Sequence, residues 1–366
     1  YTSKSGDVDC DSRTGASALW LSTLDEKREA GEILYDLAIV ENRASQAHKA
    51  FIVLAIPQYE ETFLPNFRNG DVVVLYERNK DTDNVTNKMV FKGNIESITD
   101  SELRIRLRAS QRNPLVFPEN SRYAVEHDTM DTTFRSMYLG LSSFMDANPE
   151  RRDLLLGQRP PRFDTAYENR IACATDDFER VALKAVAARD YFLLVGPPGT
   201  GKTSRALRRM VEHFYACPSM QILLLAYTNR AVDEICQSLS SIRPQVDYIR
   251  VGSELSCDAR FRKHLLENVL SECNNRREVN IRMADCRICV GTVASIASKS
   301  ELFKLKHFDV AIVDEATQIL EPQLLGVLCA RFKDGRNGIG KFILIGDHKQ
   351  LPAVVLQSNE QSEVHD

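Results

Sequence analysis

The first 160 residues change their hydrophobic period twice. Near the N-terminus, apolar side chains recur at the three- and four-residue spacing of an amphipathic helix, and Thr23 and Glu26 have the spacing of a capping box. The pattern predicts a long helix over residues 19–37. Its apolar positions are Leu19, Trp20, Leu24, Ala30, Ile33, Leu34 and Leu37.

After this helix the apolar positions alternate every second residue, which is typical of half-buried strands. Turn-rich pieces such as Asn69-Gly70 separate the alternating runs. Short strands joined by polar turns, with no helix between them, predict a small antiparallel β-barrel at about residues 49–126. The predicted strands are 51–55, 71–76, 89–98 and 103–107.

Helical spacing returns after the barrel, and two adjacent prolines, Pro160 and Pro161, then interrupt the chain. We expect this second helix to pack against the first one, and we place a domain boundary near residue 160. The apolar stripe of the second helix is Phe134, Met137, Tyr138, Leu141, Phe144 and Met145.

Beyond residue 160, short apolar runs alternate with helical patterns, which predicts a mostly parallel sheet with helices on both faces. The charged stretch near residues 258–283 is predicted to be an exposed helical insertion. The predicted strands of this α/β domain, residues 161–366, are 192–195, 222–226, 247–251, 286–290, 310–313 and 342–345.

Composition narrows the possibilities only slightly. A chain of 366 residues is long enough for two or three domains, and its net charge of −4 neither supports nor excludes a nucleic-acid partner. The nine cysteines are scattered, and Cys286 and Cys289 read as part of a buried strand and not as half of a zinc site. We therefore expect a reducing, cytoplasmic compartment and no membrane span; the first residue, Tyr1, suggests a piece of a longer protein.

The most informative motif is GPPGTGKT at residues 196–203, which follows an apolar strand and precedes a helical pattern. Backbone N–H groups of such a loop cradle a polyphosphate, Lys202 reaches the β- and γ-phosphates, and the hydroxyl of Thr203 is placed to hold Mg²⁺. The predicted ligand is a nucleoside triphosphate. Its binding residues are Gly196, Pro197, Pro198, Gly199, Thr200, Gly201, Lys202, Thr203 and Ser204.

A second acidic motif follows the predicted strand at 310–313. Asp314 is placed to hold Mg²⁺ beside Thr203, and Glu315 to orient and deprotonate the attacking water. Gln350, in the sequence GDHKQLP, is placed to hydrogen-bond the γ-phosphate or the water. Lys202, Asp314, Glu315 and Gln350 are therefore the predicted catalytic residues.

The motifs GPPGTGKT, AYTNRAVDE, GTVAS, DEATQ and GDHKQLP stand in the order of those of superfamily-1 helicases. The chain resembles the 5′-to-3′ branch of that superfamily, which includes the nonsense-mediated-decay and replication nuclease-helicase enzymes. The resemblance implies a P-loop RecA-like first lobe at residues 161–366, preceded at 1–160 by a small barrel on stalk helices. Phe178 stands near the position at which the family usually has an adenine-reading glutamine, and the second RecA-like lobe does not appear in this chain.

The same resemblance assigns Thr228, Asn229 and Thr292 to the backbone of single-stranded DNA or RNA. Each of these residues, taken alone, is more typical of a helix cap or turn. A stripe of Arg104, Arg106 and Arg108 on the last predicted barrel strand fits either a phosphate contact or a solvated outer face.

The function expected from these motifs is that of the N-terminal half of an ATP-dependent DNA or RNA helicase that uses ATP and Mg²⁺. The chain by itself is expected to bind nucleotide but not to unwind duplexes. The alternative is a nucleic-acid-binding scaffold with a degenerate P-loop ATPase. A GTPase is disfavoured because no guanine-reading Asn-Lys-x-Asp follows the phosphate loop.

Overall fold

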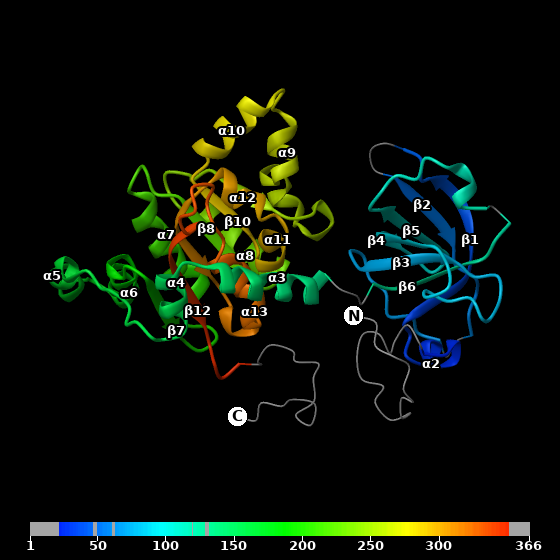
Figure 1. The fold of residues 1–366 in the computed structure, drawn as a ribbon, viewed down its shortest axis with the longest axis horizontal. Coiled ribbons are helices and arrows are strands. Elements are labelled where there is room, and N and C mark those ends of the chain that lie inside the picture. The colour runs from blue at the N-terminus through cyan, green and yellow to red at the C-terminus, as the bar shows by residue number, and fades with distance from the viewer. Residues whose placement is uncertain (1–21, 47–49, 61–62, 119, 129–131, 351–366) are drawn as a thin grey trace. The chain divides into compact units, whose positions relative to one another are not determined.

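The computed structural model describes residues 22–46, 50–60, 63–118, 120–128 and 132–350. The chain forms two compact units, one that ends at residue 128 and one that begins at residue 132 (Figure 1). The first unit is a β-barrel and the second is an α/β lobe. Both were predicted from the hydrophobic period of the sequence.

The first unit is a closed barrel of six antiparallel strands in the order β1-β2-β5-β4-β3-β6. The alternation of the sequence builds it, because Leu103, Ile105 and Leu107 of β5 all point into the buried interior. The four predicted strands are confirmed, and two more close the barrel. The elements are α2 (Leu24–Glu29), β1 (Ile33–Arg43), β2 (Phe51–Ala55), β3 (Val72–Glu77), β4 (Val90–Ile98), β5 (Glu102–Leu107) and β6 (Tyr123–His127).

The predicted helix over residues 19–37 is wrong after Glu29, and its first residues, 19–21, lie outside the described part of the chain. The capping box of Thr23 and Glu26 does begin a helix, but Gly31, with φ 68°, ends it, and β1 follows. Asp36, with φ 56°, then shifts the register, so that Leu34 and Leu37 both face the barrel interior. This bulge gives a strand the three-residue apolar spacing of a helix.

A buried ion pair fastens α2 to the barrel. The ammonium group of Lys27 lies 2.9 Å from a carboxylate oxygen of Glu126 on β6, and the hydroxyl of Tyr76 on β3 donates to the same carboxylate at 2.6 Å. All three side chains are buried. The charges are thus paired and hydrogen-bonded, which a buried carboxylate requires.

The second unit is a six-stranded sheet in the order β7-β12-β11-β8-β10-β9, and all its strand pairs are parallel. Its six predicted strands are confirmed. None of the helices that the structure describes is long and apolar enough to cross a bilayer. The strands are β7 (Tyr191–Val195), β8 (Ile222–Ala226), β9 (Tyr248–Val251), β10 (Ile288–Thr292), β11 (Phe308–Val313) and β12 (Ile339–Gly346). The helices are α3 (Thr132–Asp146), α4 (Pro149–Leu155), α5 (Glu168–Ala172), α6 (Asp177–Ala187), α7 (Arg208–Tyr215), α8 (Asn229–Ser240), α9 (Leu266–Ser271), α10 (Arg276–Asp285), α11 (Val293–Ser298), α12 (Glu301–Leu305) and α13 (Glu321–Leu328).

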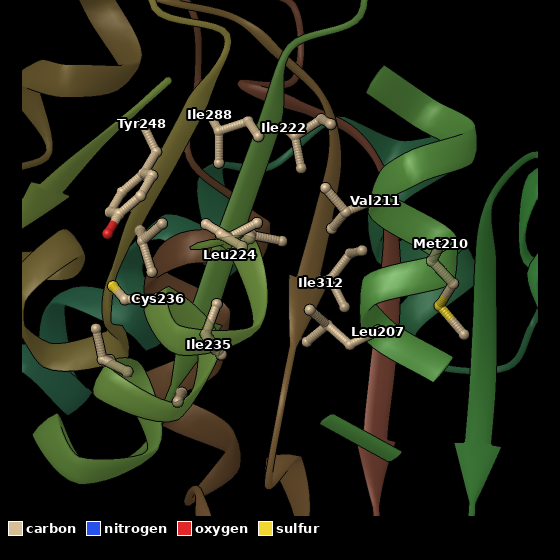
Figure 2. Packing of buried hydrophobic residues seen from close by; sticks show 14 of the residues in the cluster. Leu207, Met210, Val211, Ile222, Leu224, Ile235, Cys236, Tyr248, Ile288 and Ile312 are labelled. Atoms are coloured by element: carbon tan, nitrogen blue, oxygen red, sulfur yellow. The ribbon is translucent and has the colours of Figure 1, made fainter. Parts of the chain in front are cut away.

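Helices cover both faces of this sheet, and each face has its own core. On β11, Val310 and Ile312 point to the core beneath α6, α7 and α8, whereas Ala311 and Val313 point to the core on the other face. Figure 2 shows the first core, in which side chains from α7 and α8 converge on the strands. The continuous apolar runs of the sequence reflect burial on both faces.

The helix predicted after the barrel is α3, and it packs along α13 of the α/β lobe. Gly140 of α3 lies directly on the backbone of α13: a Cβ atom built there would overlap the carbonyl oxygen of Pro322 and lie 3.1 Å from the nitrogen of Gly326. Because α3 belongs to the lobe, the units divide near residue 130 and not near the predicted 160.

The stretch predicted as a helical insertion is helical. It comprises a 3₁₀ turn at Ala259–His264 followed by α9 and α10, which project from one side of the lobe (Figure 1). Phe261, Leu265 and Val269 are buried, so apolar contacts anchor it to the lobe.

The helix crossing gives a prediction for Gly140→Ala. An ordinary glycine inside a helix gains stability, about 1 kcal/mol, when it becomes alanine. At Gly140 the new methyl group must push α3 off α13, and we expect a net loss of about 1–3 kcal/mol, as for other overpacked contacts. Thermal unfolding of the variant, compared with Ser142→Ala at an exposed position of the same helix, measures it. A stabilised Gly140→Ala variant would contradict the close crossing.

Candidate functional site

Three loops meet at one edge of the lobe's sheet. They follow β7, β11 and β12, which are neighbours in the sheet, and parallel strands all end at the same edge. The loops surround a cavity of about 390 Å³. Open parallel sheets bind their ligands at this carboxyl edge, so the fold itself points to the cavity.

The loop after β7 owes its shape to two glycines. Gly199 and Gly201 have φ values of 77° and 81°, which other residues rarely adopt. The ammonium group of Lys202 donates to the carbonyl oxygens of Gly196 and, at 3.1 Å, Pro197. The hydroxyl of Thr200 also donates to the carbonyl of Pro197, at 2.7 Å. The turn thus holds a cation beside its own backbone.

The hydroxyl of Thr203 donates to the carboxylate of Asp314 at 2.5 Å, and this contact joins the loop after β7 to the end of β11. Asp314 is 1% exposed, and its burial raises the pKa of its carboxyl group. Among the described residues, no cationic side chain forms an ion pair with it. A buried carboxylate next to a hydroxyl presents hard oxygen donors, which fit a small divalent cation that keeps part of its water shell.

Glu315 lines the same cavity in a strained conformation. Its φ of 54° and ψ of 36° lie in the left-handed region, which costs a non-glycine residue about 1–3 kcal/mol. The backbone N–H of Glu315 donates to the Asp314 carboxylate at 3.0 Å, which secures the turn. Burial, followed by the charges of Asp314 and Glu234, raises the pKa of the Glu315 carboxyl group.

The loop after β12 completes the cavity. Asp347 is buried and accepts from the backbone N–H of Lys349 at 3.0 Å and from the amide of Gln350 at 3.5 Å. The hydroxyl of Thr317, which follows the Asp314-Glu315 pair, donates to the carbonyl of Asp347 at 3.3 Å. These bonds connect the loop that bears Gln350 to the loop that bears the two carboxylates.

The structure places all four predicted catalytic residues on this cavity. Of the predicted phosphate-loop residues, Gly196 and Thr200 do not line it but shape the loop through backbone contacts. Glu234 was not predicted. It lies on α8 and belongs to the motif AYTNRAVDE, of which only Thr228 and Asn229 were given a role, in nucleic-acid binding. Asp347 belongs to the GDHKQLP motif, but the motif alone does not indicate that its side chain is buried at the cavity. The lining residues without a predicted role are Glu234, Thr317, Gln318, Gly346 and Asp347.

The three predicted nucleic-acid contacts lie at the same edge: Thr228 and Asn229 follow β8, and Thr292 is the last residue of the neighbouring strand β10. The hydroxyl of Thr228 caps α8 by accepting from the N–H of Ala231 at 3.1 Å. Thr292 is 6% exposed, and its hydroxyl accepts from the N–H of Ser295 at 3.0 Å. Both threonines therefore cap a helix, which is the role that each would have without a nucleic-acid contact. Asn229 is the first residue of α8.

Two arginines of the stripe on the barrel, Arg104 and Arg106, form ion pairs with glutamates. The guanidinium of Arg104 lies 4.0 Å from the ring centroid of Phe51 and 3.9 Å from carboxylate oxygens of Glu41 and Glu96. Arg106 pairs with Glu96. These contacts favour the solvated-face interpretation over a phosphate contact.

Phe178, near the position of the usual adenine-reading glutamine, is in the first turn of α6. Its ring packs against the core beneath α6, α7 and α8, and the guanidinium of Arg205 lies 5.5 Å from its centroid. The side chain has no hydrogen-bonding group with which to read a base.

Comparison with protein families gives two overlapping matches to the AAA domain, over residues 175–284 and 271–358. These matches contain the whole phosphate cavity. The chain belongs to this family. Together with the order of its motifs and its relatives, the match makes it a superfamily-1 helicase sequence of the 5′-to-3′ branch, a family that uses ATP and usually a divalent metal.

Three curated relatives are named as DNA replication ATP-dependent helicase/nucleases. DNA2 of Bos taurus is 26% identical over 94% of this chain, and DNA2 of Gallus gallus is 30% identical over 68%. JHS1 of Arabidopsis thaliana is 28% identical over 81%. The chain spans only 32%, 25% and 22% of these relatives' lengths, respectively.

The site gives a prediction for Lys202→Ala. The hydrogen bonds of the Lys202 ammonium group go to its own loop, so we expect the fold to persist while ATP hydrolysis falls at least about 10²-fold, the effect of removing one preorganised donor to a developing charge. ATP turnover and thermal unfolding of the complete protein measure the two effects. Lys304→Ala, an exposed lysine of α12, is the control. Hydrolysis near the wild-type rate would remove Lys202 from the mechanism.

Proposed function

We propose that this chain is the first-lobe half of an ATP-dependent helicase that couples ATP hydrolysis to movement along single-stranded nucleic acid. The observation that carries the proposal is the bond between Thr203 and Asp314, because it brings the phosphate loop and the acidic motif to one cavity. Family membership and the names of the relatives support the same activity.

In this proposal the residues of the cavity divide the work of phosphoryl transfer. The N–H groups of residues 199–203 and the ammonium group of Lys202 bind the β- and γ-phosphates. The Thr203 hydroxyl and the Asp314 carboxylate hold Mg²⁺. The ion, when bound, neutralises charge that develops on the phosphate oxygens.

Glu315 accepts the proton of the attacking water. Burial, together with the charge of Asp314, raises the pKa of the Glu315 carboxyl group. The strained backbone fixes the carboxylate at the cavity wall. Gln350, held by Asp347, orients the water or contacts the γ-phosphate. A contact between Gln350 and the γ-phosphate would let the protein sense whether that phosphate is present.

Unwinding by this proposal also requires a second RecA-like lobe. In related phosphoryl-transfer enzymes, an arginine supplied from outside the phosphate site raises the rate about 10³- to 10⁵-fold. We therefore propose that the chain alone binds nucleotide and does not separate strands.

The decisive experiment measures ATP turnover by the complete protein with no nucleic acid, with single-stranded DNA and with single-stranded RNA. Stimulation by either strand supports the helicase, and the relatives' names favour DNA. A protein that binds single strands without hydrolysing ATP would instead be the scaffold with a degenerate ATPase.

We predict that Glu315→Gln slows hydrolysis about 10²- to 10⁴-fold, the range for losing a general base, while Mg·ATP binding stays intact. The amide keeps the size of the side chain but accepts no proton. Single-turnover hydrolysis and nucleotide titration separate the two quantities. If affinity fell as steeply as turnover, Glu315 would belong to the binding shell and not to proton transfer.

We predict that Asn229→Ala weakens binding to unrelated single strands by a similar factor, a few-fold each, because a contact to the phosphate backbone carries no base information. Titration of three strands of different composition, at two salt concentrations, measures it. Losses that depend on the base sequence would contradict a backbone contact at Asn229.

A further inference from the structure

Helix α8 contacts both the proposed nucleic-acid site and the phosphate loop. It begins at Asn229, at the edge where single-stranded nucleic acid is proposed to bind, and Ser238 near its other end bonds a residue of the phosphate loop. We propose that α8 couples nucleic-acid binding to ATP hydrolysis, through a bond from Ser238 to the backbone of Thr203 and through Glu234 in the phosphate cavity. The inference rests on the proposed function and adds the residues that transmit the signal.

Helix α8 is packed along one face and capped at its first turn. Its inner face, formed by Val232, Ile235, Cys236 and Leu239, is buried in the core shared with α7 and the sheet (Figure 2). Thr228 caps its first turn, so the N-terminus is fixed to the helix and does not fray. A displacement at Asn229 therefore reaches the last turn of the helix.

Ser238 attaches this helix to the phosphate loop. Its side chain is 7% exposed, and its hydroxyl donates to the carbonyl oxygen of Thr203 at 3.2 Å. The side chain of the same threonine bonds the Asp314 carboxylate. Any shift of α8 is thus passed by one hydrogen bond to a residue proposed to hold the metal.

The segment that receives this bond has an uncommon winding. Lys202–Leu207 forms a π-helical turn, in which the N–H of Ala206 donates to the carbonyl of Gly201 at 3.0 Å. Such turns are rare and occur frequently at functional sites. Ser238 therefore contacts a residue of this unusual turn, Thr203.

Glu234 is the second connection. It lines the phosphate cavity together with Glu315, and it also lines a neighbouring polar groove of about 790 Å³, which it shares with Thr203 and Ser204. Arg230, one turn earlier, is 91% exposed and lies 3.6 Å from the Glu234 carboxylate. An exposed pair of this kind contributes little to stability, so a nucleic-acid phosphate can displace Glu234 from Arg230 at little cost.

The two connections differ in kind, and the proposed coupling requires both of them. The Ser238 bond transmits a movement of the helix, and the Arg230–Glu234 pair transmits a change of charge beside the cavity. Coupling between two ligands is reciprocal, so the factor by which nucleic acid tightens nucleotide binding equals the factor by which nucleotide tightens nucleic-acid binding. This coupling factor is obtained from binding affinities alone, so it tests the proposal separately from the rate of ATP hydrolysis.

The test uses the complete protein and a non-hydrolysable ATP analogue. The affinity for a single strand is measured with and without the analogue, and the affinity for the analogue with and without the strand. We expect a coupling factor of at least about 5 in the wild type, the lower end of typical allosteric coupling, and a factor near 1 in Ser238→Ala and in Glu234→Gln. Thermal unfolding checks that each variant folds.

Matched controls come from the same part of the lobe. Ser240→Ala removes a hydroxyl of α8 that bonds the carbonyl of Cys236 in its own helix, and Glu212→Gln removes a carboxylate of α7 that pairs with Arg208 and Arg209 outside the phosphate cavity. Both controls should keep the wild-type factor. Ser238→Thr keeps the hydroxyl and should restore the coupling, since the adjacent groove has room for its methyl group.

The outcomes separate the two proposals. A wild-type protein that hydrolyses no ATP with any single strand overturns the proposed function itself. A wild-type protein that is stimulated by single strands, with full coupling retained in Ser238→Ala, overturns the role of α8 and leaves the function standing. If Ser238→Ala did not fold, Glu234→Gln, at an exposed position, decides alone, and retained coupling there overturns the proposal.

Discussion

The bond between the Thr203 hydroxyl and the Asp314 carboxylate is the contact on which the site depends, because it joins residues 111 positions apart in the chain. The parallel sheet brings these residues together, because the carboxyl ends of β7 and β11 lie at the same edge. The order β7-β12-β11 places the two loops on either side of a third, which bears Asp347 and Gln350. Burying the charge of Asp314 costs stability, and the hydrogen bonds donated by the Thr203 hydroxyl and the Glu315 N–H offset part of that cost.

Much of the fold follows from hydrophobic period, since burial on one face or on both faces leaves a direct mark on the sequence. The failures have physical causes. The bulge at Asp36 gives β1 the apolar spacing of a helix, and only the partner strand β6 reveals the difference. The contact of Gly140 with α13 joins residues about 180 positions apart, so no local pattern could assign α3 to the lobe.

The site was more predictable than the packing, because phosphate chemistry demands particular residues at fixed spacing. Lys202, Thr203, Asp314 and Glu315 were assigned for that reason, and all four line one cavity. Glu234 escaped prediction because its position depends on how α8 lies against the phosphate loop. Thr228 and Thr292 illustrate the reverse case: their motif suggested a ligand contact, whereas the structure engages their hydroxyls in helix caps.

The fold also explains why the two proposed binding sites are neighbours. In a parallel α/β lobe, each helix that follows a strand begins at the carboxyl edge of the sheet, so its partly positive N-terminal end faces that edge. The helical turn after β7 and helix α8 after β8 both start there. An ATP phosphate and a nucleic-acid phosphate are attracted to the same edge by the same dipoles. The proposed coupling needs no long pathway, because α8 begins at this edge and its Ser238 hydroxyl donates to the carbonyl of Thr203.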